Sequence, residues 1–485
     1  MKILLASSEV HPYSKTGGLA DMVAALAKTL AAGGHRVGLV TPLYAGIRKR
    51  FPKIKKFNGK LDMPLGARHV RAEVWTLAVN VRLTIYFIRQ PDFFERAELY
   101  QEQGKDYPDN ADRFIFFSKC VLHLARILPW QPELVHAHDW QTALVPLLIR
   151  HETLYGDWVR APHTCLTIHN LAYQGNFPAS AYELTNLPPG FFNPNGVEYF
   201  GGLNCLKAGI VFSDIITTVS PRYAREIMTE QFGCGLDGVL LQRHDSVLGI
   251  LNGVDYSEWK TSRNPFLDFS YSLKNPRGKV TQKLALQKEM GLPVDPDIPL
   301  FSTISRLVDQ KGMDILLGAL EEMLGANLQF ILLGSGSPQF EQAFCDLAKR
   351  YPDKVAVRIG FNHGLSHRIE AGSDFFLMPS RYEPCGLNQM YSQRYGTIPI
   401  VRITGGLDDS VVDMNENMKT ATGIKFSEYS APALATAIRK ALAIFADSEL
   451  LNSHRANAMS GDFSWERTGE QYLRVYELAL NIFLD

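Results

Sequence analysis

Short apolar runs alternate with longer amphipathic segments along most of the chain, a pattern typical of parallel α/β folds. In the first half, apolar runs predict strands at residues 2–7, 37–41, 70–75, 83–88, 133–137, 164–168 and 214–219. Apolar positions at helical spacing predict one helix that begins near Leu19 and another over 111–127. Strand, helix and strand in this order form a βαβ unit, so we expect a doubly wound sheet.

A second alternating series begins after a polar, turn-rich stretch. Residues 244–283 contain Asn252-Gly253 and Asn264-Pro265, and we interpret this stretch as the connection between two domains. The later runs predict strands at 299–305, 328–333, 355–359, 375–378 and 398–403, and helices at 313–324, 430–445 and 464–484.

The predicted fold is therefore α/β, with two Rossmann-like, doubly wound domains that face each other across a deep cleft. We expect an N-terminal domain over 1–243, the connection over 244–283 and a C-terminal domain over 284–460. Residues 461–485 are expected to form a helix that packs back on the first domain. This helix carries the aromatic residues Trp465, Tyr472, Tyr476 and Phe483.

Composition excludes several classes of protein. A length of 485 residues favours about two or three domains. Lys+Arg and Asp+Glu are both 50, so the formal net charge is +0 and a nucleic-acid partner is not expected. The 6 cysteines show no C-x-x-C pair, which is typical of reduced thiols in the cytoplasm. We expect no signal peptide and no membrane span; a plastid stroma, after removal of a transit peptide, stays open.

The first strand leads into a glycine loop that contains Lys15, Gly17 and Gly18. This loop lies where a strand ends and a helix begins, and backbone N–H groups at such a place attract phosphate. The alternative is an ordinary turn with a solvated lysine. The loop lacks the G-x-G-x-x-G pattern of dinucleotide-binding proteins. Further along, the polar, aromatic segment 90–110 predicts a mobile loop over a site.

Four turns of the second domain follow strands in the same way. Arg306 ends a strand and Lys311 opens the next helix, where cations oppose the helix dipole unless an anion compensates them. The other turns contain Gly334, the run Glu383-Pro384-Cys385-Gly386-Leu387 and the run Thr404-Gly405. Each turn alone is weak evidence. Together with Lys15, they predict a phosphate-bearing ligand.

Histidines at strand ends allow a different interpretation. His136 and His138 point to one face of a strand, and His163 and His169 follow it in the chain, so a metal cluster of the kind found in TIM-barrel hydrolases is possible. The two-sheet pattern argues against a single barrel.

Seven segments in order resemble the bacterial-type glycogen/starch synthase family. They are KTGGLAD, HAHDW, TIHNLAYQG, LNGVD, SRLVDQKG, SRYEPCGLNQMY and TGGL. The resemblance runs from Met1 to the C-terminal helix and implies a retaining GT-B glucosyltransferase. Such enzymes transfer glucose, typically from ADP-glucose, to the 4-OH at the non-reducing end of an α-1,4-glucan, without a metal or PLP. ADP-glucose versus UDP-glucose stays open, as does the product, glycogen or starch.

The resemblance also implies roles for individual residues. The catalytic set is Glu383, His169, Lys15, Arg306 and Lys311. The donor-binding set is Lys15, Gly17, Gly18, Asn170, Asn252, Arg306, Lys311, Gly334, Phe361, Glu383, Cys385, Gly386, Leu387, Thr404 and Gly405. The weaker acceptor-binding set is Glu9, Tyr107, Asp139 and Trp140. Glu383 is either a stabiliser of positive charge on the glucosyl ring or a covalent nucleophile. Tyr391 stands where the wider superfamily often has a second glutamate.

The expected partners are ADP-glucose or ADP and a glucan such as glycogen, starch or a maltooligosaccharide, with neither nucleic acid nor membrane. The oligomeric state is open. The alternatives are another GT-B glucosyltransferase, a PLP-dependent glucan phosphorylase, and a non-catalytic glucan-binding protein on the same fold.

Overall fold

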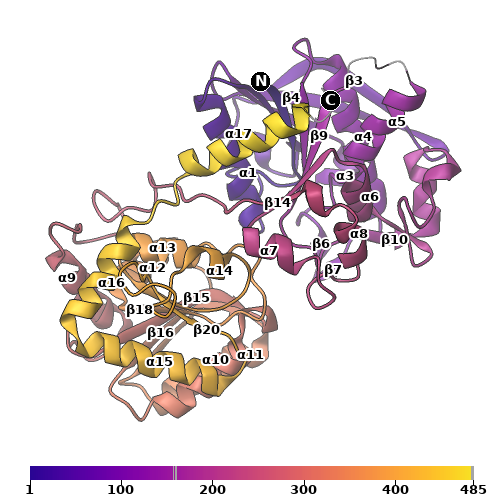
Figure 1. The fold of residues 1–485 in the computed structure, drawn as a ribbon. Helices are drawn as coiled ribbons and strands as arrows, with labels where there is room; N and C mark the ends of the chain where they lie inside the picture. Colours follow the sequence, from indigo (N-terminus) through magenta and orange to yellow (C-terminus); the bar gives the residue numbers. More distant parts are fainter. Residues whose placement is uncertain (157, 159–160, 482–485) are drawn as a thin grey trace. The chain divides into compact units, whose positions relative to one another are not determined.

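The computed structural model describes residues 1–156, 158 and 161–481. The chain divides into two compact units (Figure 1). The first unit comprises residues 1–219, 224–250 and the segment that begins at Trp465, and the second comprises 220–223 and 251–464. The predicted linker 244–283 is therefore divided between the units. Its Asn-Gly and Asn-Pro pairs mark loops, and loops need not be domain boundaries.

A nine-stranded sheet forms the first unit, in the order β14-β13-β9-β8-β1-β2-β5-β4-β3. The strands are β1 (Lys2–Ala6), β2 (Arg36–Pro42), β3 (Lys55–Leu65), β4 (Arg68–Ala78), β5 (Leu83–Arg89), β8 (Leu134–His138), β9 (His163–Ile168), β13 (Ile215–Thr218) and β14 (Val247–Gly249). β4 pairs antiparallel with both β3 and β5, and the other pairs are parallel. The predicted strands are present, and β3 extends the sheet at an edge where the polar sequence gives little signal.

Helices and short elements complete the first unit. The helices are α1 (Gly18–Ala32), α2 (Ile47–Arg50), α3 (Pro91–Phe94), α4 (Asn110–Ile127), α5 (Leu144–Tyr155), α6 (Cys205–Phe212), α7 (Pro221–Glu226, which spans a boundary between the units), α8 (Asp237–Leu241) and α17 (Trp465–Asn481). The 3₁₀ helices are η1 (Ala179–Thr185), η2 (Pro189–Phe191) and η3 (His244–Ser246). Small sheets join β6 (Gln101–Glu102) with β7 (Lys105–Asp106), and β10 (Asn176–Pro178) with β12 (Gly202–Asn204) and β11 (Glu198–Tyr199).

The C-terminal helix α17 belongs to the first unit, although its sequence follows the second. It contacts α1 and β9 (Figure 1). The hydroxyl of Tyr476 lies 2.8 Å from Nδ1 of His136 on β8, so a polar contact accompanies the apolar packing. Phe483, which the sequence analysis assigned to this helix, lies outside the described residues.

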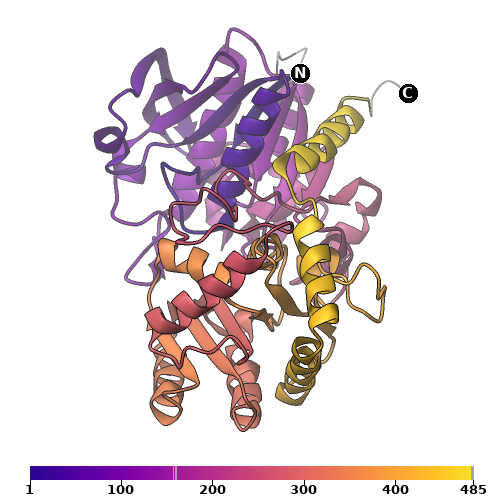
Figure 2. The ribbon, with the colours of Figure 1, turned by 90° about the vertical axis from the view of Figure 1, so that its left-hand side faces the viewer.

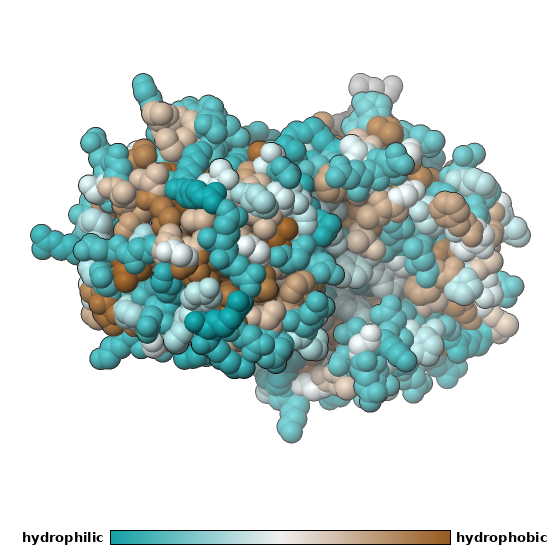
Figure 3. Space-filling view, turned by 90° about the horizontal axis from the view of Figure 1, so that it is seen from below, coloured by the Kyte–Doolittle hydropathy of each residue, from teal (hydrophilic) through white to brown (hydrophobic). Residues whose placement is uncertain are grey.

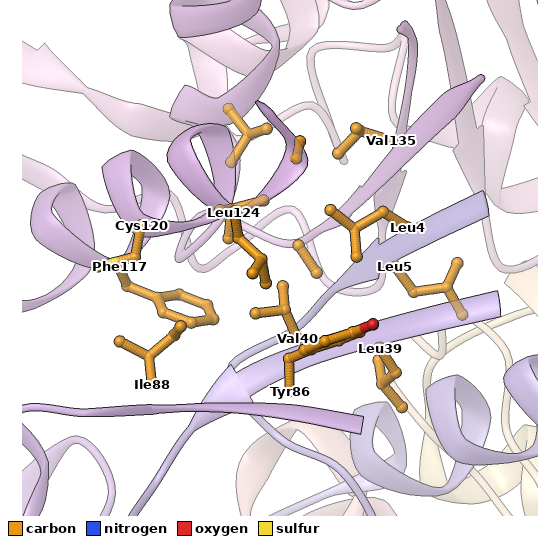
Figure 4. Packing of buried hydrophobic residues seen from close by; sticks show 14 of the residues in the cluster. Leu4, Leu5, Leu39, Val40, Tyr86, Ile88, Phe117, Cys120, Leu124 and Val135 are labelled. Carbon is orange, nitrogen blue, oxygen red and sulfur yellow. The ribbon is translucent and has the colours of Figure 1, made fainter. Parts of the chain in front are cut away.

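The core of the first unit explains why its central strands are nearly continuous apolar runs. Figure 4 shows Leu4 and Val40, from the neighbouring strands β1 and β2, with Leu124 of α4 and Val135 of β8 close by. These residues are at most 1% exposed. A parallel strand covered on both faces has no solvent side on which polar residues would alternate.

The second unit is a six-stranded parallel sheet in the order β17-β16-β15-β18-β19-β20. Figure 2 shows helices of this unit, coloured from red to yellow, beside its strands. The strands are β15 (Leu300–Leu307), β16 (Gln329–Gly336), β17 (Val355–Ile359), β18 (Phe375–Met378), β19 (Ile398–Arg402) and β20 (Ile424–Phe426). The helices are α9 (Arg277–Met290), η4 (Asp309–Lys311), α10 (Met313–Met323), α11 (Pro338–Arg350), α12 (His363–Gly372), α13 (Asn388–Arg394), α14 (Gly405–Ser410), α15 (Ala431–Ala446) and α16 (Ser448–Ser460).

Alternate residues of β16 face two different layers of helices. Phe330 and Leu332 belong to the apolar cluster built with α10 and α15. Ile331 and Leu333 belong to the cluster built with α9 and α12. This period of two shows that the sheet is covered on both faces, as a doubly wound fold requires.

Each sheet has a reversal point, where consecutive parallel strands are added on opposite sides. In the first unit this point lies between β1 and β8, and in the second it lies between β15 and β18. Ligands of open α/β sheets bind beside the carboxyl ends of the strands at this point. Lys15 and Gly17 follow β1, Asp139 follows β8, and Lys311 and Glu383 follow β15 and β18.

The surface carries a mixture of residue types. On the face drawn in Figure 3, hydrophilic residues are interspersed with apolar ones. Within the described residues, no helix is long and apolar enough to cross a membrane.

Candidate active site

Glu9 organises the glycine loop that follows β1. Its side chain accepts hydrogen bonds from the Thr16 backbone N–H at 2.5 Å, the Thr16 hydroxyl at 2.6 Å and the Gly17 N–H at 3.4 Å. The Tyr100 hydroxyl donates a further bond at 2.8 Å. Glu9 is 3% exposed, so a buried carboxylate fixes the backbone of this loop. The hydrogen bonds of Glu9 give it a supporting role in this loop. Its predicted role in binding the acceptor stays a prediction.

The loop presents Lys15 and Gly17 to solvent. Nζ of Lys15 lies 2.6 Å from Oδ2 of Asp21, and the lysine side chain is 48% exposed. Gly17 has extended backbone, with φ −152°, and a Cβ placed there would meet no atom within 4 Å. Neither torsion nor packing within the unit therefore requires a glycine at position 17. A ligand that approaches the backbone closely would require one.

His169 follows β9 and is bonded to His138 of β8. Nδ1 of His138 lies 3.1 Å from Nε2 of His169. His138 is 0% exposed, and its own Nε2 has no hydrogen-bond partner among the described residues. Because a buried N–H without an acceptor is rarer than an unpaired acceptor, we infer that the hydrogen of His138 lies on Nδ1 and points at His169. Nδ1 of His169 then carries the ring hydrogen and can donate a hydrogen bond to a ligand.

Burial keeps these rings uncharged. It lowers the pKa of His169 to about 3, and, together with His136 and His169, it lowers the pKa of His138 well below its usual value. The site therefore offers neutral imidazoles at neutral pH. A neutral ring donates to or accepts from a sugar hydroxyl without adding charge.

Asp139 joins the ends of β8 and β9. Its Oδ1 accepts a hydrogen bond from the His169 backbone N–H at 2.7 Å, and its φ of 57° lies in the left-handed region. Burial raises the pKa of Asp139 to about 7, opposed by backbone hydrogen bonds from His169 and Asn170 and assisted by the charge of Glu9. Strained, perturbed residues of this kind cluster at functional sites.

The buried His136 belongs to the structure of the sheet. Nε2 lies 2.6 Å from the Thr167 hydroxyl, and Nδ1 lies beside Tyr476. Among the described residues, the only three histidine, cysteine or acidic side chains with ligand atoms within 4.8 Å of one another are Glu258, His363 and His367 of the second unit. The metal cluster considered around His136 and His138 is therefore wrong for the described part of the chain.

In the second unit, Lys311 and Glu383 form a buried ion pair. Nζ of Lys311 lies 2.5 Å from Oε2 of Glu383, with side-chain exposures of 19% and 7%. The Ser380 hydroxyl donates to the same oxygen at 3.0 Å. The lysine follows β15 and the glutamate follows β18, so the pair spans the reversal point of the sheet. Both Lys311 and Ser380 bond to Oε2, which leaves Oε1 for a ligand.

Gly405 and Gly406 pack directly on the backbone of the Glu383 loop. A Cβ at Gly405 would lie 2.0 Å from the carbonyl oxygen of Glu383, and one at Gly406 would lie 2.1 Å from that of Cys385. Gly405 also has a φ of 43°. These glycines are required by close backbone approach, which explains them without a phosphate.

Cys385 and Asn252 lie next to each other. The backbone N–H of Asn252 bonds to the Cys385 thiol, while burial raises the pKa of that thiol to about 12. Oδ1 of Asn252 is buried and has no hydrogen-bond partner within the described chain. Gly386 follows with a φ of 71°, and Leu387 is the N-cap residue of α13.

Other predicted donor residues differ in their surroundings. Arg306 is exposed, and its guanidinium lies 3.4 Å from Oε1 of Gln310. Phe361 is 81% exposed. Gly334 belongs to β16 and not to a loop: it pairs with Ser305, and a Cβ at position 334 would lie 2.0 Å from the Ser305 carbonyl oxygen. The prediction of a close-approach loop there is wrong, because the strand continues to Gly336.

Comparison with known proteins identifies the family. Residues 2–242 match the starch synthase catalytic domain, and residues 288–458 match glycosyl transferases group 1. A glycogen synthase of Anaeromyxobacter sp. (strain Fw109-5) is 46% identical over 478 residues, which cover 98% of this chain and 99% of that protein. The chain belongs to the glycogen/starch synthase family. A glycogen synthase of Koribacter versatilis (strain Ellin345) is 42% identical, with 99% of each chain covered.

Solved structures agree with this assignment. The catalytic domain of starch synthase IV from Arabidopsis thaliana, bound to ADP and acarbose, is 33% identical, with a TM-score of 0.88 and 99% of each chain covered. A sucrose-phosphate synthase from Thermosynechococcus elongatus has a TM-score of 0.60 at 18% identity and shows the fold alone. The family member is a glycosyltransferase of the two-domain GT-B fold, as predicted. A TIM barrel is excluded.

Two predicted acceptor residues, Tyr107 and Trp140, pack against other side chains of the first unit. Tyr107 is 8% exposed, with the guanidinium groups of Arg96 and Arg113 at 4.6 and 4.9 Å from its ring centroid. Trp140 packs against Phe114, with ring centroids 5.1 Å apart, and against Gly175. Tyr107 is therefore buried, whereas Trp140 is half-buried and its acceptor role stays a prediction. The pattern of aromatic residues near a strand end does not distinguish packing from binding.

The segment 90–110 contains both packed and exposed parts, and residues 101–106 are exposed. Its mobility stays a prediction. α3 and the β6–β7 hairpin lie in this segment, and Phe94 is 0% exposed. Its Tyr100 reaches Glu9 and was missed as a supporting residue, since a lone tyrosine in a polar segment gives no signal. Ser380, Asp21 and His138 were also missed. Their positions inside the quoted motifs SRYEPCG, KTGGLAD and HAHDW were the available clue.

Proposed function

We propose that this chain elongates an α-1,4-glucan by transferring glucose from ADP-glucose, with retention of configuration and with no metal or PLP taking part in the transfer. The family assignment supports the class of reaction. The observation that carries the proposal is the Lys311–Glu383 pair at the reversal point of the second sheet, with the exposed Arg306 nearby along β15. The related starch synthase IV bound to ADP and acarbose supports an ADP-sugar donor and a glucan acceptor.

The cations are proposed to stabilise the leaving group. As the bond between the anomeric carbon and the diphosphate breaks, negative charge grows on the ADP oxygens. In the second unit, Arg306 and Lys311 would bind a diphosphate. In the first unit, Lys15 with the Gly17 and Gly18 amides would bind a phosphate. Fixed cations in a site of low dielectric each lower the barrier by roughly 2–4 kcal/mol. Three such cations supply the charge that Mg²⁺ provides in other nucleotide-dependent enzymes.

Glu383 is proposed to stabilise the positive charge that develops on the glucosyl ring. Its Oε2 is engaged by Lys311 and Ser380, which lowers the electron density available for attack on carbon. Oε1 is left to accept hydrogen bonds from sugar hydroxyls. Electrostatic stabilisation therefore fits this carboxylate better than covalent catalysis.

His169 is proposed to donate Nδ1–H to a hydroxyl of the transferred glucose. The hydrogen bond from His138 fixes the tautomer that makes this donation possible. The backbone of Asn170, and Asn252 beside Cys385, would complete the polar lining around the donor. Asp139 would position His169, because its carboxylate accepts a hydrogen bond from the His169 backbone N–H.

The test is transfer of labelled glucose to glycogen from ADP-glucose and, separately, from UDP-glucose, with EDTA present throughout. We expect EDTA-resistant incorporation from ADP-glucose that falls by at least about 100-fold in Glu383→Ala. The matched control is Glu416→Ala, because Glu416 is also paired with a lysine, Lys425 at 2.9 Å, in the same unit. It should leave transfer unchanged.

Three results would contradict the proposal. They are incorporation from UDP-glucose alone, activity that appears only with added phosphate or metal, and equal loss in both variants. A covalent glucosyl adduct on Glu383, detected by mass spectrometry after rapid quenching, would replace charge stabilisation by nucleophilic catalysis.

A further inference from the structure

Two histidines on α12 and one glutamate face each other in the second unit. His363 and His367 are four residues apart on the helix, so they lie on the same face, one turn apart. Nε2 of His363 lies 3.2 Å from Oε1 of Glu258, and one ligand atom from each of the three residues lies within 4.8 Å of the others. We propose that Glu258, His363 and His367 bind a zinc ion.

His367 supplies an independent reason. It is 0% exposed, and its Nε2 has no hydrogen-bond partner among the described residues. Its other nitrogen, Nδ1, lies 2.8 Å from the Tyr395 hydroxyl. Buried polar atoms are nearly always paired, so this Nε2 requires an explanation, and a metal ion in place of the missing partner provides one.

The surroundings hold the His367 ring in place for such a bond. Trp259 stacks on it with ring centroids 4.2 Å apart, and Phe266 stacks at 4.8 Å. Nδ2 of Asn264 donates to the Tyr395 hydroxyl at 2.9 Å and lies 3.3 Å from Nδ1 of His367. Zinc binding at Nε2 therefore requires the tautomer in which Nδ1–H is donated to the Tyr395 hydroxyl, the contact that orients metal-bound histidines. The ring is therefore fixed before any ion arrives.

The donor set favours Zn²⁺. Two imidazole nitrogens and one carboxylate oxygen are a common three-residue set for zinc, with water in the fourth position. Glu258 and His363 are 44% and 43% exposed, so an ion can enter from solvent. The neighbouring cation Arg368 donates two bonds of 2.7 Å to Glu289. This ion pair partly offsets the charge of Arg368.

The ion would connect two parts of the chain that are distant in sequence. Glu258 lies between β14 and α9, where the structure has no named helix or strand over 251–276, while His363 opens α12. A metal bound only by the folded chain stabilises it by mass action. The proposed site is therefore structural, and its occupancy does not depend on the glucosyl transfer proposed above.

The test uses the full chain, free of any affinity tag and stripped with a chelator. Zn²⁺ is titrated by calorimetry, Co²⁺ is followed through its visible absorption, and the melting temperature is measured with and without Zn²⁺. The variants are His363→Ala and Glu258→Gln, both at exposed positions that should not disturb folding. The matched control is His69→Ala, since His69 forms a similar 3.2 Å pair with Asp62 but belongs to no three-residue group.

We expect one zinc per chain, a rise in melting temperature, and affinity that falls at least about tenfold in both site variants but not in the control. Absence of binding, equal binding in His363→Ala, or one zinc per two chains would overturn the proposal. Failure of glucose transfer with intact zinc binding would contradict only the proposed function.

Discussion

The proposed phosphate-binding loops of the two units are built in opposite ways. The glycine loop of the first unit is open: a Cβ at Gly17 would meet nothing within 4 Å. The loops of the second unit are crowded: a Cβ at Gly405 would lie 2.0 Å from a carbonyl oxygen. The same residue type thus leaves space for a ligand in one loop and lets two backbone segments touch in the other.

The ion pairs of the two loops also differ in burial: the pair in the first unit is exposed, and the pair in the second is buried. Lys15 pairs with Asp21 at a solvent-exposed position, whereas Lys311 pairs with the buried Glu383. Lys15 can therefore change with little loss of stability. Lys311 and Glu383, in contrast, also hold the second unit together.

The largest expected effect separates the two kinds of glycine. Gly405→Ala should lower the free energy of unfolding by about 3–5 kcal/mol, because it adds left-handed strain to a steric clash. Gly17→Ala should cost less than about 1 kcal/mol, yet it should lower transfer by about tenfold, because its methyl group occupies the space of the phosphate. Urea unfolding and the glycogen assay measure both. Equal stability of the two variants would contradict the distinction between a crowded Gly405 and an open Gly17.

The second effect separates the two lysines. Lys311→Ala should lower the free energy of unfolding by about 2–4 kcal/mol, since it leaves Glu383 buried without its cation. Lys15→Ala should cost at most about 1 kcal/mol, because its pair is exposed. Both variants should lose about 100-fold to 1000-fold in transfer. The idea fails if Lys15→Ala is the less stable protein, or if either variant transfers glucose normally.

The third effect concerns Asp139, whose hydrogen bonds come from backbone amides instead of a lysine. Its pKa is raised to about 7, so the folded protein binds a proton that the unfolded chain releases near pH 4. This contribution to stability is present at low pH and is lost as the pH rises from about 4 to 7.

Asp139→Asn removes this dependence. Relative to the variant, the wild-type protein should lose about 2 kcal/mol of unfolding free energy over that interval, after allowance for partial exposure of the carboxylate. Denaturation at several pH values measures the difference. Parallel stability curves for the two proteins would show that Asp139 is ionised throughout.

The smallest effect tests the histidine pair. His138→Asn should lower transfer by about tenfold, because His169 loses the hydrogen bond that fixes its tautomer and orientation. Nitrogen NMR of histidine-labelled protein should show the Nδ1–H form of His169 in the wild type and a mixture of tautomers in the variant. A tautomer unchanged by the substitution would assign His138 to packing alone. His123→Asn, a change at a half-buried histidine on α4, is the control.

The sequence by itself determined the two doubly wound sheets and the loops that carry the site. Buried parallel strands are continuous apolar runs, and the helices between them keep one apolar face, so both can be recognised locally. The motifs KTGGLAD and SRYEPCG lie at the carboxyl ends of strands for the same reason. The positions of Lys15, Lys311 and Glu383 could therefore be predicted.

Only the tertiary structure decided which of these residues meet. The Tyr476–His136 contact joins residues 340 positions apart, and Glu9 reaches Tyr100 across 91. No periodicity records such distances, because it reports only which face of an element is buried. Whether a glycine leaves space or fills a backbone contact, as Gly17 and Gly405 do, likewise depends on atoms from other parts of the chain.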